Sequence, residues 1–288
     1  MYDLAELLST AEETAVAAGL GAREKWSQGS PVSGKGFRDV VTEADFAAQA
    51  VVTDAIQSRF PGHGFLTEEE DSALPTEGDV LWVIDPIDGT INYSRDLPTF
   101  CVSVAAIRGG QSQAAALAQP EVLAGAIYDP MRGELFSAAR GLGGTILNAH
   151  GEKRPLRTSA VSQLDQALLC HDWSHLTAGR QAVLETLTRL HQHVFNIRAL
   201  GSASLALAWL AAGRVDLYFN YSLKPWDIAA AQLMIREAGG HLTHADGTDL
   251  VWDVAGMNCL ASNGRLHSAF LVAALREAPL HATCSFVT

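Results

Sequence analysis

The sequence predicts an α/β protein. In the last third of the chain, helix-like segments that open at Gly201 and Pro225 alternate with apolar strand-like runs at 215–219 and 257–261. A further helix-like segment follows at 266–275. Glycine closes the first two of these helices and proline occupies a first turn, as is common in helices. Alternation of this kind favours helices packed in layers on a sheet.

The chain starts with a predicted amphipathic helix. Leucine and alanine recur at three- and four-residue spacing over 3–18, and we expect the helix to end near Gly19 or Gly21 or to continue to about Trp26. The glycine-rich residues 29–36 predict a loop. Their Gly-x-x-x-x-Gly-Lys pattern is not a nucleotide P-loop, because no Ser or Thr follows the lysine and no apolar strand precedes the glycines.

Thr42 predicts the N-cap of a second helix. Asp45 stands three residues later, as in a capping box, and the helical pattern runs to about Phe60. Asp45 therefore fits a capping acid, and it fits equally a carboxylate that faces a functional site. A short strand at 64–67 follows and leads into an acidic run whose first member, at the strand end, is Glu68.

The middle of the chain predicts mostly strands and turns. We expect strands at 81–84, 100–107, 113–117, 123–128 and 134–138, the last two as a hairpin. A glycine-rich bend is expected at 141–144 and a helix at 181–193. A boundary near 145–155 would divide the chain into an N-terminal α+β half, 1–147, and a C-terminal α/β half, 148–288.

The stretch Asp-Pro-Ile-Asp-Gly-Thr at 85–90 gathers polar groups behind an apolar strand. Its proline fixes one φ angle, and Gly89 permits backbone angles that other residues resist. We expect a sharp turn after Asp85 that brings Asp88 back beside it, with Thr90 where a helix could begin. An acidic turn with an aspartate cap is the plainer interpretation. The functional interpretation is a binding site, in which the carboxylates hold a hard cation and the backbone N–H groups bind a phosphate.

Five acidic residues stand at strand ends or helix starts and are candidates for one metal site: Asp45, Glu68, Asp85, Asp88 and Asp227. If they meet, cations are needed, because two bare carboxylates about 4 Å apart repel by about 4 kcal/mol at an effective dielectric near 20. All the proposed ligands are oxygens, with no Cys or His. This donor set selects Mg²⁺, with Mn²⁺ as a substitute.

The composition limits the classes of partner. The formal charge of −12 argues against a nucleic-acid polymer, whose phosphates need a basic surface. It leaves a small phosphorylated substrate open, because bound cations invert the local field. No apolar run approaches the roughly 20 residues of a membrane span. The four cysteines are widely scattered, which predicts free thiols in a reducing compartment. The N-terminus lacks the basic start of a secretory signal, so the two observations together favour a cytoplasmic protein.

Several motifs together resemble those of the inositol monophosphatase family. In chain order they are Asp-Val-Val-Thr-x-x-Asp at 39–45, Thr-Glu-Glu at 67–69, Asp-Pro-Ile-Asp-Gly-Thr-x-Asn-Tyr at 85–93, Gly-Ser-Ala at 201–203 and Trp-Asp-x-Ala-Ala at 226–230. The resemblance implies a layered αβαβα sandwich of the inositol monophosphatase and fructose-1,6-bisphosphatase type. It also implies a lithium-sensitive, Mg²⁺-dependent phosphatase that is commonly a homodimer, with its site in the cleft between the two halves.

The resemblance implies two metal positions. Glu68, Asp85 and the carbonyl of Ile87 would hold a first Mg²⁺. Asp85, Asp88 and Asp227 would hold a second. A third, weaker ion is also possible in this family.

The same resemblance assigns the catalytic and substrate contacts. Thr90 with Asp45 looks like the pair that activates the nucleophilic water, with Glu68 beside it. Glu69 matches a position that supports a third ion or the water, and Lys35 matches a basic position near the metal loop. The matching substrate contacts are Asp88, Gly89, Thr90, Gly201, Ser202, Ala203, Asn220 and Asp227.

Two departures leave the substrate open. Asn220 stands where inositol-specific members carry an acid, and the segment 170–175 replaces a small, glycine-containing stretch. The implied reaction is hydrolysis of a small phosphate monoester, inositol 1-phosphate or another polyol or sugar phosphate, by a metal-activated water. Histidinol phosphate and a 3′-nucleotide are alternative substrates. The alternative to an enzyme is a non-catalytic regulator that binds phosphosugars on the same fold. Such a protein would be expected to have lost Asp45, Thr90 or Glu68, and all three are present.

Overall fold

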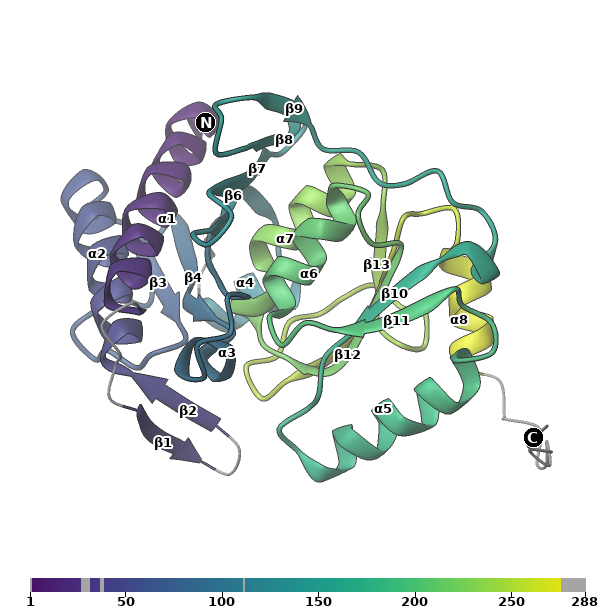
Figure 1. The fold of residues 1–288 in the computed structure, drawn as a ribbon. Helices are drawn as coiled ribbons and strands as arrows, with labels where there is room; N and C mark the ends of the chain where they lie inside the picture. The colour runs from purple at the N-terminus through teal and green to yellow at the C-terminus, as the bar shows by residue number, and fades with distance from the viewer. Residues whose placement is uncertain (1, 27–31, 37–38, 111, 276–288) are drawn as a thin grey trace.

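The described residues form two large β-sheets, a separate two-stranded pair and the helices around them (Figure 1). The computed structural model describes residues 2–26, 32–36, 39–110 and 112–275.

The first sheet has seven strands in the order β3-β4-β5-β6-β7-β8-β9. The strands are β3 Gly64–Thr67, β4 Val80–Asp88, β5 Cys101–Arg108, β6 Val122–Asp129, β7 Glu134–Ala139, β8 Gly143–Leu147 and β9 Lys153–Pro155. β3 is parallel to β4, and every later pair is antiparallel. The predicted hairpin is therefore confirmed as β6 and β7.

The second sheet has five strands in the order β11-β10-β12-β14-β13. The strands are β10 Leu168–His171, β11 Asn196–Ala199, β12 Leu217–Leu223, β13 His241–Thr243 and β14 Met257–Ser262. β10 is parallel to both β11 and β12, and β14 is antiparallel to β12 and β13. A separate antiparallel pair, β1 Val32–Gly36 and β2 Asp39–Thr42, lies near the lower edge of the view in Figure 1.

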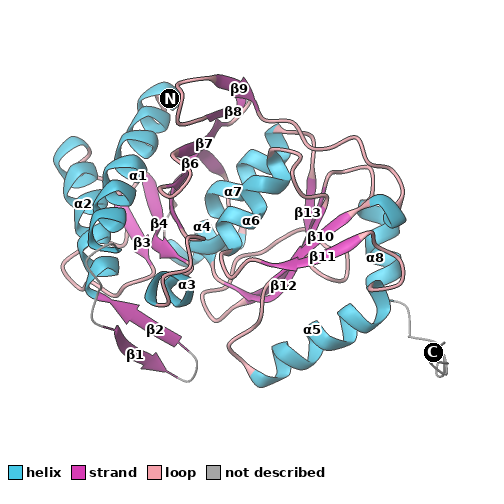
Figure 2. Ribbon diagram, in the orientation of Figure 1, coloured by secondary structure: helices cyan, strands magenta, loops and turns pink. Residues whose placement is uncertain are grey.

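The helices form three layers around the sheets (Figure 2). The helices are α1 Leu4–Trp26, α2 Glu43–Arg59, α3 Thr90–Ser94, α4 Gln113–Ala118, α5 Thr177–Leu190, α6 Ala203–Ala211, α7 Pro225–Glu237 and α8 His267–Leu275, with a 3₁₀ turn at Leu164–Gln166. α1 and α2 pack on the first sheet, α6 and α7 contact strands of both sheets, and α5 and α8 pack on the second sheet. This order confirms the predicted αβαβα sandwich.

The middle layer is apolar on all sides because both of its faces are covered. Eight residues of α6 are buried, with Trp209 the exception, and α7 is buried along most of its length. α7 lies so close to β6 that a Cβ on Gly125 would come within 2.9 Å of the Ala230 Cα. Small residues on both elements therefore set the distance between the first sheet and the central helices.

The first helix continues to Trp26, the longest of the lengths expected from the sequence. It passes through Gly19 without a break because this glycine faces β6. A Cβ there would lie 2.5 Å from Cδ1 of Tyr128. The glycine thus allows close packing of helix on sheet, although glycine in mid-helix costs about 1 kcal/mol relative to alanine.

The prediction of a strand at 113–117 was wrong, since these residues form α4. Ser112 caps this helix by accepting a hydrogen bond from Ala115 N at 3.2 Å. The alanine-rich run has high helix propensity, and a cap at the right position decides the outcome for so short an apolar segment.

Two other expectations need correction. The predicted loop at 29–36 contains β1, which pairs with β2, and its first residues, 29–31, lie outside the described part of the chain. Lys35 is a residue of β1, but its side chain is not among those described. The helix expected at 181–193 begins four residues earlier and ends at Leu190.

The first sheet extends beyond residue 147, because β9 still pairs with β8. The division of the chain at 147 and 148 stays a prediction. None of the helices in the described ranges has both the length and the apolar character needed to cross a bilayer. Cys101, Cys170 and Cys259 are buried free thiols, and Cys284 lies outside the described residues.

Candidate active site

A cavity of about 370 Å³ lies at the end of β4 and the starts of α3, α6 and α7. Eleven of the predicted site residues line it: Glu68, Asp85, Ile87, Asp88, Gly89, Thr90, Gly201, Ser202, Ala203, Asn220 and Asp227. Asp45 is fully buried and is linked to the cavity through its hydrogen bond with Thr90. The structure therefore brings together residues that are widely separated in the sequence.

β4 carries two carboxylates to the same place because it bulges between them. Residues three apart on a regular strand point to opposite faces. The pairing of β4 with β5 shifts register between Asp85 and Asp88, and a bulge re-aims side chains in this way. The expected turn after Asp85 is wrong in position, since the strand continues through Asp88 and the chain turns at Gly89, whose φ is 100°.

Asp85, Asp88 and Asp227 offer carboxylate oxygens that all lie within 4.8 Å of one another. Burial raises the pKa of Asp85 well above its usual value, and repulsion from Glu68 and the two other aspartates adds to the rise. Burial and the charge of Asp88 likewise raise the pKa of Asp227 well above its usual value. Negative charge at this cluster is therefore strongly disfavoured in the absence of a cation.

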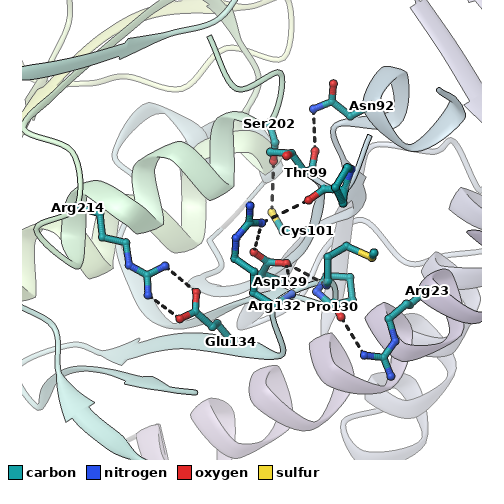
Figure 3. Close-up of polar contacts among 12 residues, drawn as sticks. Arg23, Asn92, Thr99, Cys101, Asp129, Pro130, Arg132, Glu134, Ser202 and Arg214 are labelled. Carbon is teal, nitrogen blue, oxygen red and sulfur yellow. Dashed lines mark hydrogen bonds and ion pairs between the residues drawn. The ribbon is translucent and has the colours of Figure 1, made fainter. Parts of the chain in front are cut away.

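Asp88 joins the first sheet to the start of α6. Its Oδ2 accepts hydrogen bonds from Ser202 Oγ at 2.5 Å and Ser204 N at 2.8 Å, and its Oδ1 accepts from Ala203 N at 3.1 Å. The Cys101 thiol donates to Oδ2 at 3.5 Å and also faces Ser202 (Figure 3). Burial raises the pKa of Asp88, and these donors oppose the rise.

Asp227 and Glu68 complete the acidic side of the cavity. Asp227 stands in the first turn of α7, where its Oδ2 accepts from Lys224 N at 2.7 Å. Glu68 follows β3, and its N–H donates to the Ile84 carbonyl at 3.1 Å. Its half-buried side chain is close enough to hydrogen-bond with Asp85. Both carboxylates are thus placed by the backbone of the element that carries them.

Asp45 has the two roles that the sequence left open. Its Oδ2 accepts from the N–H of Thr42 at 2.8 Å and from Thr42 Oγ1 at 2.6 Å, so it closes the capping box of α2. Its Oδ1 faces Thr90 Oγ1 at 3.2 Å. The carbonyl of Ile87 also lies 3.0 Å from that hydroxyl, which has one proton for the two acceptors.

The backbone donors around the cavity divide into two groups. Gly201 N donates to Asp172 Oδ1, and Ala203 N donates to Asp88, so both N–H groups are engaged within the protein. Outside the regular ladders and helices of the described residues, the N–H groups of Gly89 and Thr90 have no recorded partner. These two therefore remain able to donate to a ligand in the cavity.

Comparison with known proteins agrees with this arrangement. A family model described as "Inositol monophosphatase family" matches residues 3–280. The chain belongs to the inositol monophosphatase family. An inositol-1-monophosphatase of Caulobacter vibrioides is 37% identical over 242 residues, which cover 83% of this chain and 89% of that protein.

Two further relatives place the chain within this family. The Nus factor SuhB of Salmonella typhimurium is 39% identical over 241 residues, covering 83% of this chain and 84% of that protein. The crystal structure of extragenic suppressor protein suhB from Bartonella henselae superimposes with a TM-score of 0.82 at 31% identity and covers 93% of this chain and 98% of that one. The similarity thus extends over most of each molecule.

The inositol monophosphatase fold brings one further acid, Asp172, to the cavity of this chain, where sequence reasoning did not place it. Asp172 is 7% exposed, and it accepts hydrogen bonds from Gly201 N and from Tyr218 Oη at 3.1 Å. Burial raises its pKa to about 7. Trp173 and Arg180 also line the cavity. The unusual segment 170–175 was the sequence signal for Asp172 and Trp173, whereas no signal pointed to Arg180.

The acidic cluster of this family member fits a hard divalent cation. Asp85 Oδ1 is buried and has no hydrogen-bond partner among the described residues, although a buried polar atom without a partner is costly. The clustered donors are carboxylate oxygens, which Mg²⁺ prefers. An ion at this point would supply both the partner that Asp85 lacks and the charge that the cluster needs.

Proposed function

We propose that this protein hydrolyses small phosphate monoesters in a Mg²⁺-dependent reaction. The observation that carries the proposal is the cluster of Asp85, Asp88 and Asp227, in which Asp85 Oδ1 has no partner in the described structure. Bound cations would stabilise the charged form of this cluster, which lines a cavity of about 370 Å³ that can hold a small ester. Membership of the inositol monophosphatase family supports this assignment.

The metal ligands follow from the cavity lining and the family motifs. Glu68, Asp85 and the carbonyl of Ile87 would hold one Mg²⁺, and Asp85, Asp88 and Asp227 a second. Mn²⁺ is a possible substitute, and Glu69 would support a third ion. When bound, such ions supply the positive charge that stabilises a phosphoryl transition state and lower the pKa of an attacking water.

The residues of the chain itself then position the reactants. Asp45 is held by α2 and accepts from Thr90, so the Thr90 oxygen is oriented with lone pairs available to a water in the cavity. A water held there can pass a proton through the hydroxyl to the Asp45 carboxylate. Asp45 is thus the proton acceptor, Thr90 is the group that contacts the water, and Glu68 helps to hold it.

The uncommitted N–H groups of Gly89 and Thr90 would receive phosphate oxygens. Donors fixed in advance by the backbone stabilise developing charge without reorganisation. Gly201 donates its N–H group to Asp172, and Ala203 donates its N–H group to Asp88. These two residues therefore line the cavity and hold the two carboxylates in place. We also propose that the alcohol part of the substrate contacts Ser202, Asn220 and Asp227.

The proposal leaves several monoesters open, because Asn220 replaces the acid of inositol-specific members. Polyol and sugar phosphates come first, with histidinol phosphate and 3′-nucleotides as alternatives. One relative is named a Nus factor, which favours a second candidate, a non-catalytic binding role. Against that role, none of the three residues to which the resemblance gives a catalytic part is missing. Thr90 and Glu68 line the cavity, and Asp45 accepts a hydrogen bond from Thr90.

The test is phosphate release from a panel of monoesters with and without Mg²⁺, and with lithium added. We expect turnover that requires Mg²⁺ and falls with lithium. In Asp85→Asn, kcat/KM should fall by about 100-fold or more, since a charge that acts in the transition state is removed. Mg²⁺ should also raise the melting temperature of the wild type and not of this variant.

Asp54→Asn is the matched control, because Asp54 is exposed on α2 and remote from the cavity. It should keep both the turnover and the Mg²⁺-dependent stabilisation. Near wild-type turnover in Asp85→Asn at saturating Mg²⁺ would refute its role as a ligand. Absence of turnover on every ester would favour the non-catalytic role. Light scattering on the same preparation tests the homodimer that belongs to this proposal.

A further inference from the structure

Some residues that line the cavity lie outside the family motifs, and the part of the lining that the segment before α5 and α5 itself supply is called the α5 end. Trp173, Ser174 and His175 come from the segment between β10 and α5, and Arg180 from the first turns of α5. Val40 of β2 lines the same cavity from the other side.

Arg180 brings a positive charge to this end without an ion-pair partner. Its Nε donates to the Ser174 carbonyl at 3.0 Å, and its guanidinium lies over the ring of Trp173, 5.5 Å from the ring centre. No salt bridge is recorded for it in the described part of the chain. A guanidinium has five N–H donors, so most remain available. The chain has a net charge of −12, so an arginine in its cavity with no salt bridge to a described residue is unusual.

Asn220 also presents a donor to the cavity. Its Oδ1 accepts from Ser222 N at 2.9 Å, and because a backbone N–H can only donate, this contact fixes which end of the amide is oxygen. Its Nδ2 donates to Tyr218 Oη at 3.3 Å, since the single Tyr218 proton goes to Asp172. The second hydrogen of Nδ2 has no recorded partner among the described residues.

Asp172 is the acid that could oppose an anion at this end. Both of its oxygens are engaged, Oδ1 with Gly201 N and Oδ2 with the Tyr218 hydroxyl. Its side chain is 7% exposed. The lining therefore offers the N–H groups of Arg180 and Asn220 to a ligand, while both oxygens of Asp172 are engaged within the protein.

We propose that the preferred substrate carries a second anionic group, a carboxylate or a second phosphate, which Arg180 binds while the first phosphate lies over the acidic cluster. The proposal rests on the phosphatase function and narrows its substrate class. A neutral polyol matches this end less well, because its hydroxyl groups carry no charge for the guanidinium. Planar guanidinium groups bind carboxylate and phosphate through two parallel hydrogen bonds.

The test uses pairs of esters that differ only in the second group. 3-Phosphoglycerate is compared with glycerol 3-phosphate, and fructose 1,6-bisphosphate with fructose 1-phosphate. The first pair tests a carboxylate and the second pair a phosphate. For at least one pair, we expect kcat/KM to favour the doubly anionic ester by roughly tenfold or more, which corresponds to about 1.4 kcal/mol.

The variant Arg180→Gln should remove most of that preference, chiefly through KM. Arg180→Lys should keep part of the preference, because the positive charge remains. It should not keep all of it, because lysine lacks the planar group that makes two parallel hydrogen bonds. Arg157→Gln is the control for net charge, since Arg157 is exposed, outside the cavity and without a recorded salt bridge in the described chain. It should leave the ratio within each pair unchanged.

Binding measured by calorimetry, with Ca²⁺ in place of Mg²⁺, separates this proposal from the phosphatase function. Tighter binding of the doubly anionic ester, lost in Arg180→Gln, supports the proposal even if nothing is hydrolysed. Turnover of both members of each pair at equal kcat/KM, unchanged in Arg180→Gln, would overturn the proposal and leave the phosphatase intact. Neither turnover nor a binding difference would overturn both.

Discussion

At the scale of single residues, burial moves titratable groups toward their neutral forms. It raises the pKa of Asp85 well above its usual value, and neighbouring carboxylates add to the rise. It lowers the pKa of His267 to about 4, with His241 as a second cause. Two hydroxyl groups bond the ring nitrogens of His267 at 3.0 Å, so the neutral imidazole is satisfied. By contrast, Asp85 Oδ1 has no hydrogen-bond partner among the described residues, and a bound cation would give it a partner.

The buried His267 predicts a pH dependence of stability. The unfolded chain protonates this residue below about pH 6.5, whereas the folded protein keeps it neutral until about pH 4. The unfolded state therefore binds more protons in this window, and the free energy of unfolding falls as the pH is lowered through it. From pH 7 to pH 5 this one residue should contribute a loss of about 2 kcal/mol.

Urea unfolding of wild type and His267→Gln at pH 7 and pH 5 checks this prediction. Glutamine does not titrate, so the variant should lose less stability between the two pH values, whatever its stability at pH 7. Other groups titrate equally in both proteins and cancel in the comparison. Equal losses in the two proteins would contradict the prediction.

At the scale of elements, the end of β4 positions the site through its backbone. The bulge aims Asp85 and Asp88 at one cavity, and Gly89 turns the chain into α3 with a φ of 100°. The turn packs tightly, because a Cβ on Gly89 would lie 3.0 Å from the carbonyl oxygens of Gly201 and Thr99. The left-handed conformation and the close approach of backbone both require glycine here.

Gly89→Ala should therefore lower both stability and activity. The left-handed angle alone costs about 1–2 kcal/mol for a residue with a Cβ, and the contacts with backbone oxygens add to it. Gly141→Ala is the matched control, because Gly141 has a φ of 75° but no atom within 4 Å of an added Cβ. Urea unfolding should show the larger loss for Gly89→Ala, and only this variant should lose turnover. Equal losses would mean that the close packing at Gly89 contributes nothing.

At the scale of the whole molecule, several polar contacts join the first sheet to the central helices and to the loop after α6. One is the contact of Asp88 with the start of α6, and another lies at the turn from β6 to β7 (Figure 3). There Glu134 of β7 bonds Arg214 through both oxygens, at 2.5 and 2.6 Å. The guanidinium groups of Arg132 and Arg214 also lie near the ring of Trp209 in α6. The hydrogen bonds from Arg214 hold the pKa of Glu134 below its usual value.

Glu134→Gln should destabilise the protein by about 1–3 kcal/mol, because the carboxylate is 13% exposed and its loss leaves Arg214 without its partner. The control is Glu13→Gln, which removes the exposed pair with Arg59, where the side chains are 67% and 40% exposed. That change should cost well under 1 kcal/mol. Chemical unfolding measures both. A cost for Glu134→Gln no larger than that for Glu13→Gln would show that this contact does not stabilise the join.

Local sequence was sufficient for most of the helices. The helices at the start of the chain, at Thr42, at Ser202 and at Pro225 follow from periodicity, caps and proline, which act within a few residues. The short apolar segment at 113–117 was misassigned, because period alone does not separate a strand from a short helix. The start of α5 was misplaced for a similar reason, since Leu176 at its N-cap makes no side-chain cap bond.

The sequence by itself determined the family, the layered fold and the acidic residues proposed as ligands, because these depend on residue types and on motifs within short stretches. Only the tertiary structure decided how those residues are used. It places the bulge that aims Asp85 and Asp88 together, engages Gly201 and Ala203 within the protein, and brings Arg180 to the cavity. Each of these depends on contacts between segments far apart in the chain, whose geometry no local pattern specifies.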